Sequence, residues 1–209
     1  MTSTNDRMIR DVMRTRLASA HVGQDAVIVD ELKVSRGSSR MDIAVINGRI
    51  EGYEIKSDRD TLDRLSKQAS LFGLVADRMT LVVGEKHIQK ATMIVPDWWS
   101  IMSPSLSDEG SLALRVVRRG RINQGRDKKA LAEAMERDEL VALLARHGID
   151  KGRRSAGYGA LVQYAVGELT RDKIADHLKQ MLKIRAHLAS RFANSAFGRN
   201  AIFCSAPVD

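Results

Sequence analysis

Apolar residues near the N-terminus recur at the three- and four-residue intervals of an α-helix. Ile9, Val12, Met13 and Leu17 would lie on one face of such a helix. The segment that follows them, HVGQD, has no such pattern. The sequence therefore predicts a first helix over about residues 6–20.

The next part of the chain changes to the pattern of β-strands. AVIVDELKV (26–34) is rich in β-branched residues, and the glycine and serines of SRGSSR mark a turn after it. MDIAVI and IEGYEIK lie on either side of NGR, which is a strong hairpin signal. We therefore expect three consecutive antiparallel strands.

After Lys56 the apolar spacing returns to that of a helix. Leu62, Leu65, Ala69, Phe72 and Val75 fall on one face, and Ser57 or Asp60 could cap the start of this helix. MTLVVGE then has the apolar composition of a strand buried on both sides, and ATMIVPDWWSIM and SLALRVVRR, separated by SDEG, are expected to be further strands. The order helix, three strands, helix, strand predicts an α/β domain over residues 1–122.

The remaining residues, 123–209, read as a helical region. KKALAEAMERDELVALLARHG is expected to be one helix ending on Gly148, followed by a helix around 160–168 and a long helix starting at Thr170. The tail after Phe192 is small and polar, and we expect it to be loosely held.

Charge differs between the two halves of the chain. Residues 1–117 hold 16 Lys or Arg and 16 Asp or Glu, whereas residues 118–209 hold 18 and 10, an excess of eight positive charges. A basic region beside a neutral one is typical of proteins that bind a polyanion such as nucleic acid.

The single cysteine, Cys204, excludes an intrachain disulfide and a cysteine-based zinc cage. No apolar run is long enough to span a membrane and the charged start lacks a signal-peptide centre, so we expect a cytoplasmic protein without a membrane partner.

Polar residues at particular places in these elements suggest an active site. Asp42 lies on the second expected strand, Glu54 and Lys56 on the third, and Gln68 on the following helix. Taken alone, alternating Glu54, Ile55 and Lys56 is what any half-exposed strand shows. Together, the residues resemble the PD-(D/E)XK nuclease superfamily, and DELKV…RMDIAVINGRIEGYEIKSDRDTLDRL resembles an uncharacterised bacterial family within it. QASLF resembles the Gln-x-x-x-Tyr element of the RecB-like branch, but Phe72 replaces the tyrosine and Met41 replaces the usual proline.

The resemblance implies a restriction-endonuclease-like αβββαβ core with a central mixed sheet, followed here by the C-terminal helical region. It implies that Asp42, Glu54 and the backbone carbonyl of Ile55 bind a metal ion and that Lys56 assists the attacking water. Two carboxylates held close together repel each other unless a cation lies between them, and oxygen ligands favour Mg²⁺ or Mn²⁺ over zinc. We therefore expect a metal-dependent phosphodiesterase.

The hairpin register tests this expectation. A two-residue turn, which Asn-Gly usually favours, pairs Ile46 with Arg49 and places Asp42 opposite Tyr53. A three-residue turn instead pairs Asp42 with Glu54. The nuclease interpretation therefore requires an odd loop or a bulge at this hairpin.

Other residues near the motifs have two interpretations each. Glu31 is either a further carboxylate of the metal site or a charged residue at a strand end. Gln68 either positions a group in the site or is solvated. Arg40 could contact a phosphate or pair with Asp42 when metal is absent, and Arg59 and Arg64 are further candidates for nucleic-acid contacts.

The sequence thus favours a nuclease that acts on DNA rather than RNA. The main alternative is a catalytically silent nuclease-like module that binds DNA or another protein. A third interpretation, a small αβ domain with a surface ion pair at Glu54 and Lys56, holds if the site residues do not converge. The oligomeric state is left open, and a homodimer is compatible with the sequence.

Overall fold

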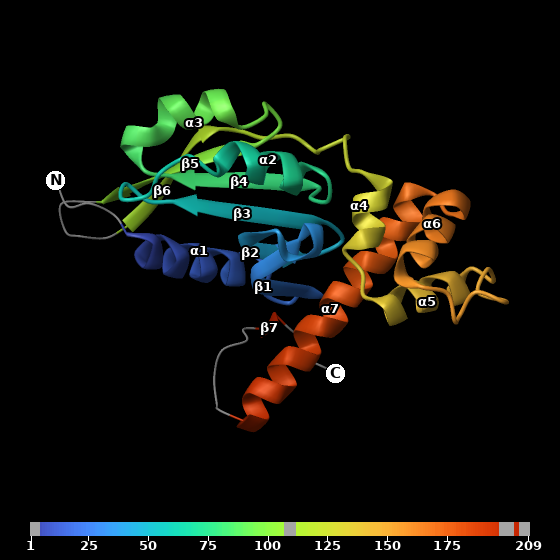
Figure 1. The fold of residues 1–209 in the computed structure, drawn as a ribbon. Helices are drawn as coiled ribbons and strands as arrows, with labels where there is room; N and C mark the ends of the chain where they lie inside the picture. The colour runs from blue at the N-terminus through green and yellow to red at the C-terminus, as the bar shows by residue number, and fades with distance from the viewer. Residues whose placement is uncertain (1–4, 107–111, 197–202, 205–209) are drawn as a thin grey trace.

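The computed structural model describes residues 5–106, 112–196 and 203–204. Helices lie on both faces of a sheet, and further helices pack beyond one end of it (Figure 1). The expected separator SDEG and much of the C-terminal tail lie outside the described residues. Among the described residues, none of the helices has the length and apolar character needed to cross a bilayer.

The described strands form one mixed sheet in the order β6-β5-β4-β3-β2-β1-β7. The first three are antiparallel to one another, β4 and β5 run parallel to β3, and β6 and β7 are antiparallel edge strands. Their bounds are Ala26–Val34 (β1), Ser39–Ile46 (β2), Ile50–Lys56 (β3), Arg78–Val83 (β4), Ser100–Leu106 (β5), Leu112–Arg118 (β6) and Phe203–Cys204 (β7). The three consecutive antiparallel strands and the α/β class are confirmed.

Helix α1 (Asp6–Ala20) covers one face of the sheet, as Figure 1 shows. The side chain of Asn5 caps its first turn by accepting a hydrogen bond from the backbone N–H of Met8 at 2.9 Å. The helix buries Ile9, Met13 and Leu17 against strand residues that include Ile43, Val45 and Ile55. The expected first helix is confirmed, with the predicted apolar residues Ile9, Met13 and Leu17 facing the sheet.

Helix α2 (Leu65–Gly73) covers the opposite face and packs Phe72 against Trp99, with both side chains fully buried. The expected caps were wrong, because the helix begins after Arg64 without a side-chain cap. Asp60 instead accepts hydrogen bonds from the backbone N–H and the hydroxyl of Ser57. The Asp60 carboxylate therefore stabilises the turn that follows β3, next to Lys56.

The expected strand over residues 91–102 was wrong in its first half. Residues 88–94 form helix α3 (Ile88–Ile94), and the strand begins only at Ser100. Val95 precedes Pro96 and is extended, as a residue before proline prefers to be, so the helix ends there. The β-branched composition of ATMIV was misleading because the proline fixes the boundary.

The loop between β2 and β3 has three residues. Ile46 pairs with Ile50 and Ile43 pairs with Tyr53, and Gly48 adopts a positive φ of 67° between them. Both Ile46 and Ile50 are buried. The odd register that the nuclease interpretation requires is therefore present.

Four helices follow the sheet: α4 (Lys128–Glu133), α5 (Arg137–Arg146), α6 (Tyr158–Glu168) and α7 (Arg171–Ala196). The single helix expected over residues 128–148 is divided into α4 and α5. Glu136 is extended and forms a capping box with Glu139, which starts a new helix. Gly148, with a φ of 71°, follows the end of α5 as expected.

The helical region packs directly against the sheet domain. One cluster of buried apolar residues continues from the sheet and α2 through α4 to α7. The side-chain amide of Asn123 donates to the carbonyls of Gly73 and Ala76, and Arg126 forms a 2.8 Å ion pair with Asp77. The division of the chain at residues 122 and 123 stays a prediction, because no observation tests whether the two parts fold independently.

Candidate active site

Glu54 is the buried acidic residue at the centre of the candidate site. Its side chain is 1% exposed, and its Oε1 atom accepts hydrogen bonds from Lys56 Nζ and Gln68 Nε2, each at 2.5 Å. Its other oxygen, Oε2, is buried and has no hydrogen-bond partner among the described residues. A buried carboxylate oxygen without a partner is costly and requires an explanation.

Asp42 lies where β2 and β3 stop pairing. The last paired residues are Ile43 and Tyr53, and beyond them the backbone N–H of Ile55 donates to Asp42 Oδ2 at 2.7 Å. The Asp42 carboxylate thus takes the place that a backbone carbonyl has in a regular ladder. This position brings Asp42 to the same cavity as Glu54.

Helix α1 supplies a cation that the sequence interpretation missed. Arg10 donates to the Asp42 carbonyl at 2.9 Å and to Asp42 Oδ1 at 3.0 Å, and lies 3.5 Å from Glu31. The expected pairing of Arg40 with Asp42 was wrong, because Arg40 pairs with Glu31 at 3.2 Å. Glu31 therefore connects the two arginines.

A signal for Arg10 was present in the sequence but was not used. Arg10 and Arg14 lie one turn apart beside the apolar stripe of α1. From there their long side chains reach the strands that the helix covers. Arg14 pairs with Asp30 of β1 in the same way. Basic residues flanking an apolar stripe thus indicate that a helix will neutralise strand carboxylates, but not which ones.

The environment of Glu54 disfavours its charge. Burial raises the pKa of Glu54 to about 7, and the negative charge of Asp42 contributes to the increase, while Lys56 and Gln68 oppose it. A cation bound between the two carboxylates would remove this conflict. The raised pKa of Glu54 therefore agrees with the expectation that a divalent ion would lie between the two carboxylates.

Asp42 and Glu54 open into a cavity of about 380 Å³ between β1, β2, β3 and α2. Its lining consists mostly of charged side chains and of small residues from the turn after β1. The lining residues are Glu31, Lys33, Gly37, Ser38, Ser39, Arg40, Asp42, Glu54, Lys56, Arg64, Lys67 and Gln68. Most predicted site residues therefore converge, and the interpretation of Glu54 and Lys56 as a surface ion pair is wrong because Glu54 is buried.

Two predicted residues have other positions. Arg59 is exposed and does not line this cavity; its backbone N–H donates to Ser57 Oγ. Ile55 is buried against α1, and it is its backbone that reaches the site. The assigned roles of all these residues stay predictions, since position alone tests none of them.

The residues present fit a hard divalent ion. Within the described part of the chain, no three His, Cys, Asp or Glu side chains are grouped so that they could hold a metal. Mg²⁺ commonly binds through one or two carboxylates and keeps several waters. Asp42, the unpartnered oxygen of Glu54 and a backbone carbonyl such as that of Ile55 would form a donor set of this kind.

Comparison with known proteins places the chain in a family. Residues 6–204 match the family described as bacteriophage P4 protein cII. Protein cII of Enterobacteria phage P4 is 26% identical over 166 residues, which are 79% of this chain and 62% of that protein, so the chain spans less than two thirds of its length. A solved structure of a protein of unknown function from Silicibacter pomeroyi matches with a TM-score of 0.44 and 16% identity over 92% of both chains. Because the family match extends over nearly the whole chain, the protein belongs to the bacteriophage P4 protein cII family.

Proposed function

We propose that the protein is a metal-dependent nuclease of the PD-(D/E)XK type that hydrolyses phosphodiester bonds in DNA. The observation that carries the proposal is the buried Oε2 atom of Glu54, which has no partner among the described residues and lies beside Asp42 in a cavity rich in cations. A bound Mg²⁺ or Mn²⁺ explains why such an oxygen is kept there. Without a ligand, the same oxygen is only destabilising.

The arrangement of elements supports this proposal. The order α1, β1, β2, β3, α2, β4, with three antiparallel strands and a parallel fourth, is the αβββαβ order expected for the superfamily. Asp42 on β2, Glu54 and Lys56 on β3 and Gln68 on α2 occupy the expected elements. The three-residue hairpin loop adds support, since the site could not converge with a two-residue loop.

The side chains have separable roles in the proposed reaction. Asp42 and Glu54 hold the divalent ion, which would polarise the phosphodiester and lower the pKa of a coordinated water. Lys56 orients the attacking water and offsets negative charge that develops on the phosphoryl oxygens. Gln68 fixes Glu54 by its hydrogen bond to Oε1. The water oxygen forms a bond to phosphorus and the water gives up a proton to solvent. One ester P–O bond breaks, and the leaving oxygen takes up a proton from solvent.

One observation favours the alternative of a catalytically silent module. Both oxygens of Asp42 already have partners, Arg10 at Oδ1 and the Ile55 N–H at Oδ2. An ion would have to share Asp42 with Arg10. A protein that kept the fold but not the activity could have this arrangement as its permanent state.

A cleavage assay separates the two functions. Purified protein is incubated with single-stranded, duplex and branched DNA and with Mg²⁺, Mn²⁺ or chelator, and the products are separated on a denaturing gel. We expect cleavage with either ion and none with chelator. Binding of DNA without cleavage of any substrate under any divalent ion would replace the nuclease by the silent module.

A further inference from the structure

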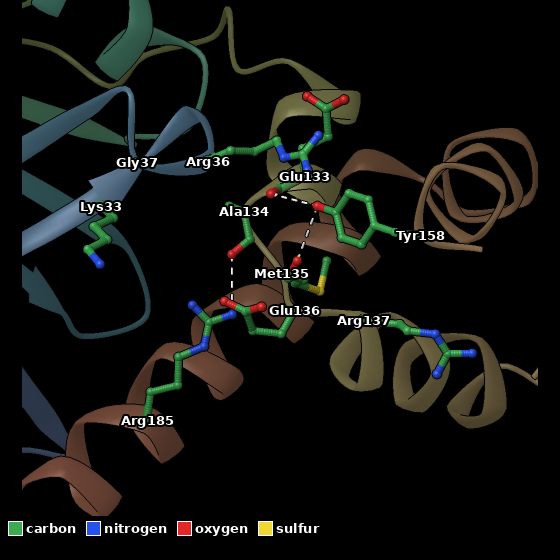
Figure 2. A pocket seen from close by; sticks show the side chains of 10 residues that line it. All are labelled: Lys33, Arg36, Gly37, Glu133, Ala134, Met135, Glu136, Arg137, Tyr158 and Arg185. Atoms are coloured by element: carbon green, nitrogen blue, oxygen red, sulfur yellow. Dashed lines mark hydrogen bonds between the residues drawn. The ribbon is translucent and has the colours of Figure 1, made fainter. Parts of the chain in front are cut away.

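The cavity at Glu54 adjoins a second cavity of about 420 Å³ next to the C-terminal helices. Lys33 and Gly37 line both cavities. The second is enclosed by the turn after β1, the segment between α4 and α5, Tyr158 of α6 and Arg185 of α7 (Figure 2). Its volume lies in the range of cavities that bind small ligands. A groove therefore connects the candidate active site with the basic helical region.

Unpaired cations follow this groove. Among the described residues, the charged groups of Arg64, Lys67 and Lys33 have no hydrogen-bond or ion-pair partner. The guanidinium of Arg36 has no ion pair there either and lies over the ring of Tyr158. Other cations along the groove are neutralised, since Arg40 pairs with Glu31 and Arg185 with Glu139. The unpaired cations thus line both cavities from α2 across β1, and the carboxylates of Glu133 and Glu136 also line the second cavity.

The last of these cations is held in place by strained backbone and by an aromatic ring. Ser35 and Arg36 adopt positive φ angles of 49° and 56°, a conformation that costs non-glycine residues about 1–3 kcal/mol. Figure 2 shows the Arg36 side chain reaching toward Tyr158, whose ring centroid lies 5.2 Å from the guanidinium carbon. Tyr158 in turn donates its hydroxyl hydrogen to the Glu133 carbonyl at 2.9 Å. Strain of this kind is commonly found at binding sites.

We propose that the second cavity is a subsite for single-stranded DNA. A strand whose cleaved phosphate lies beside Glu54 passes Lys33 and places a further phosphate against Arg36. The position of the cut rests on the proposed function, whereas the path of the strand rests on the unpaired cations. We assign a single strand because the cavities have volumes of only about 380 and 420 Å³. Separate nucleotides of a single strand can enter spaces of this size, whereas a base-paired duplex is too wide.

Binding without metal tests the subsite separately from catalysis. Labelled oligothymidylates of increasing length are titrated with protein in the presence of chelator, and fluorescence anisotropy is followed. Wild-type affinity should rise with length until both cavities are occupied. Lys33→Gln and Arg36→Gln should each weaken binding of the long oligomers about threefold to tenfold and lower the slope of log K against log salt by about 0.7.

Matched variants test whether DNA binding depends on the residues of the second cavity or only on the net positive charge of the protein. Arg119→Gln removes an exposed cation that follows the edge strand β6, at least four strands away from β1 and β2 in the sheet order, and should leave affinity unchanged. Tyr158→Leu keeps the charge of Arg36 but removes the ring beneath it, and should weaken binding as Arg36→Gln does. Tyr158→Phe keeps the ring and should not. Thermal melting checks that each variant is folded.

The outcomes distinguish the two proposals. If folded Lys33→Gln and Arg36→Gln bind DNA as tightly as Arg119→Gln does, the subsite is overturned, and the proposal of cleavage at Glu54 is unaffected. Variant-sensitive binding by a protein that never cleaves would overturn the nuclease and leave the subsite. Tighter binding of a duplex with the same dependence on Arg36 would overturn the single-strand assignment, and wild-type protein that binds no DNA would overturn both.

Discussion

Arg10 of α1 holds Asp42 of β2 by two hydrogen bonds, one to the Asp42 carbonyl at 2.9 Å and one to Oδ1 at 3.0 Å. The helix and the strand are 32 positions apart in the sequence. The interaction fixes the carboxylate next to the end of the part of β2 that pairs with β3. It also places a positive charge where a metal ion would compete for the same oxygen.

We predict opposite effects of Arg10→Gln on stability and on metal binding. Loss of hydrogen bonds to a charged partner should lower the free energy of unfolding by about 1.5–3 kcal/mol. Removal of the competing charge should tighten Mn²⁺ binding severalfold, as measured by calorimetry. Arg7→Gln, an exposed change on the same helix, serves as the control and should alter neither quantity. Weaker Mn²⁺ binding by a folded Arg10→Gln variant would show that Arg10 positions Asp42 rather than competing at it.

The fold was more predictable than this contact. The apolar spacing of α1, the strand β1 over Ala26–Val34 and the αβββαβ order follow from local patterns, and all are present. The hairpin loop was harder, because Asn47-Gly48 favours a two-residue turn. That turn would have paired Ile46 with Arg49, whereas the observed register pairs it with Ile50 and buries both isoleucines. Burial of the core therefore overrides the turn preference.

The positions of the candidate site residues were predictable, but their pairing was not. Asp42, Glu54, Lys56 and Gln68 could be placed on their elements from alternation and resemblance alone. Which cation meets which carboxylate depends on how α1 packs on the sheet, and no local pattern sets that. Arg40 was consequently paired with the wrong acid, and Arg10 was missed.

Glu54→Gln is predicted to abolish metal binding and cleavage together. The amide keeps the shape of the side chain and an acceptor for Lys56 and Gln68, but it removes the charge that binds the ion. Asp42→Asn should behave in the same way. The matched control is Glu51→Gln, the same change three residues earlier on the same strand, where alternation points the side chain to the other face. Unchanged Mn²⁺ affinity in Glu54→Gln would remove Glu54 from the metal site.

Stability should respond to Glu54→Gln in the opposite direction to activity. Burial and the charge of Asp42 outweigh the effect of Lys56 and raise the pKa of Glu54, so a neutral amide, which keeps an acceptor for Lys56, removes a charge that the site disfavours. We expect the free energy of unfolding without metal to stay the same or to rise by about 1 kcal/mol. Urea denaturation in chelator measures it, and a marked loss of stability would show that the carboxylate is held by contacts of structural importance.

Lys56→Met is predicted to separate metal binding from chemistry. The two carboxylates remain, so Mn²⁺ should still bind, while the rate of cleavage should fall by about two orders of magnitude or more when stabilisation of the transition state is lost. Lys56 is one of the groups that lower the pKa of Glu54, so binding is measured well above pH 7, where Glu54 is ionised. Lys90→Met, which removes an exposed lysine of α3 that lines neither cavity, is the control. Equal cleavage rates for the two variants would exclude a special role for Lys56.

His177 should make the protein less stable in mild acid. The residue is 4% exposed, its Nε2 donates to the Glu139 carbonyl at 3.0 Å, and its Nδ1 has no partner among the described residues. Burial lowers the pKa of His177 below its ordinary value of 6.5. Well above pH 6.5 the histidine is neutral in both states, so it contributes no pH dependence to stability there. As the pH falls below 6.5, the unfolded chain binds a proton that the folded chain resists, and stability decreases.

The measurement is the free energy of unfolding from urea titrations between about pH 7 and pH 5. His177→Gln should be more stable toward pH 5, relative to the wild type, than it is at pH 7, since the amide does not titrate. Raising the salt concentration should change the slope little, because burial rather than surface charge causes the shift. Glu54, whose pKa is raised to about 7, gains a proton in the folded state over the same range and opposes this trend, so the result is the difference between the wild-type and His177→Gln profiles. A difference that does not change between pH 7 and pH 5 would exclude His177 as the acid-sensitive group.

Arg126→Met is predicted to be the most destabilising of these changes. Arg126 and Asp77 form a 2.8 Å ion pair with side chains only 13% and 8% exposed, and Asp77 also accepts the backbone N–H of Ile50 at 2.8 Å. Removing the arginine leaves a buried carboxylate without its counter-charge, which should cost about 3–5 kcal/mol in urea denaturation. Lys129→Met breaks an exposed pair with Glu133 and should cost about 0.5 kcal/mol or less. Adding Asp77→Asn to Arg126→Met removes the orphaned charge while keeping an acceptor for Ile50, and should recover part of the loss. If Arg126→Met were no more destabilising than Lys129→Met, the ion pair would not be what holds the helical region against the sheet.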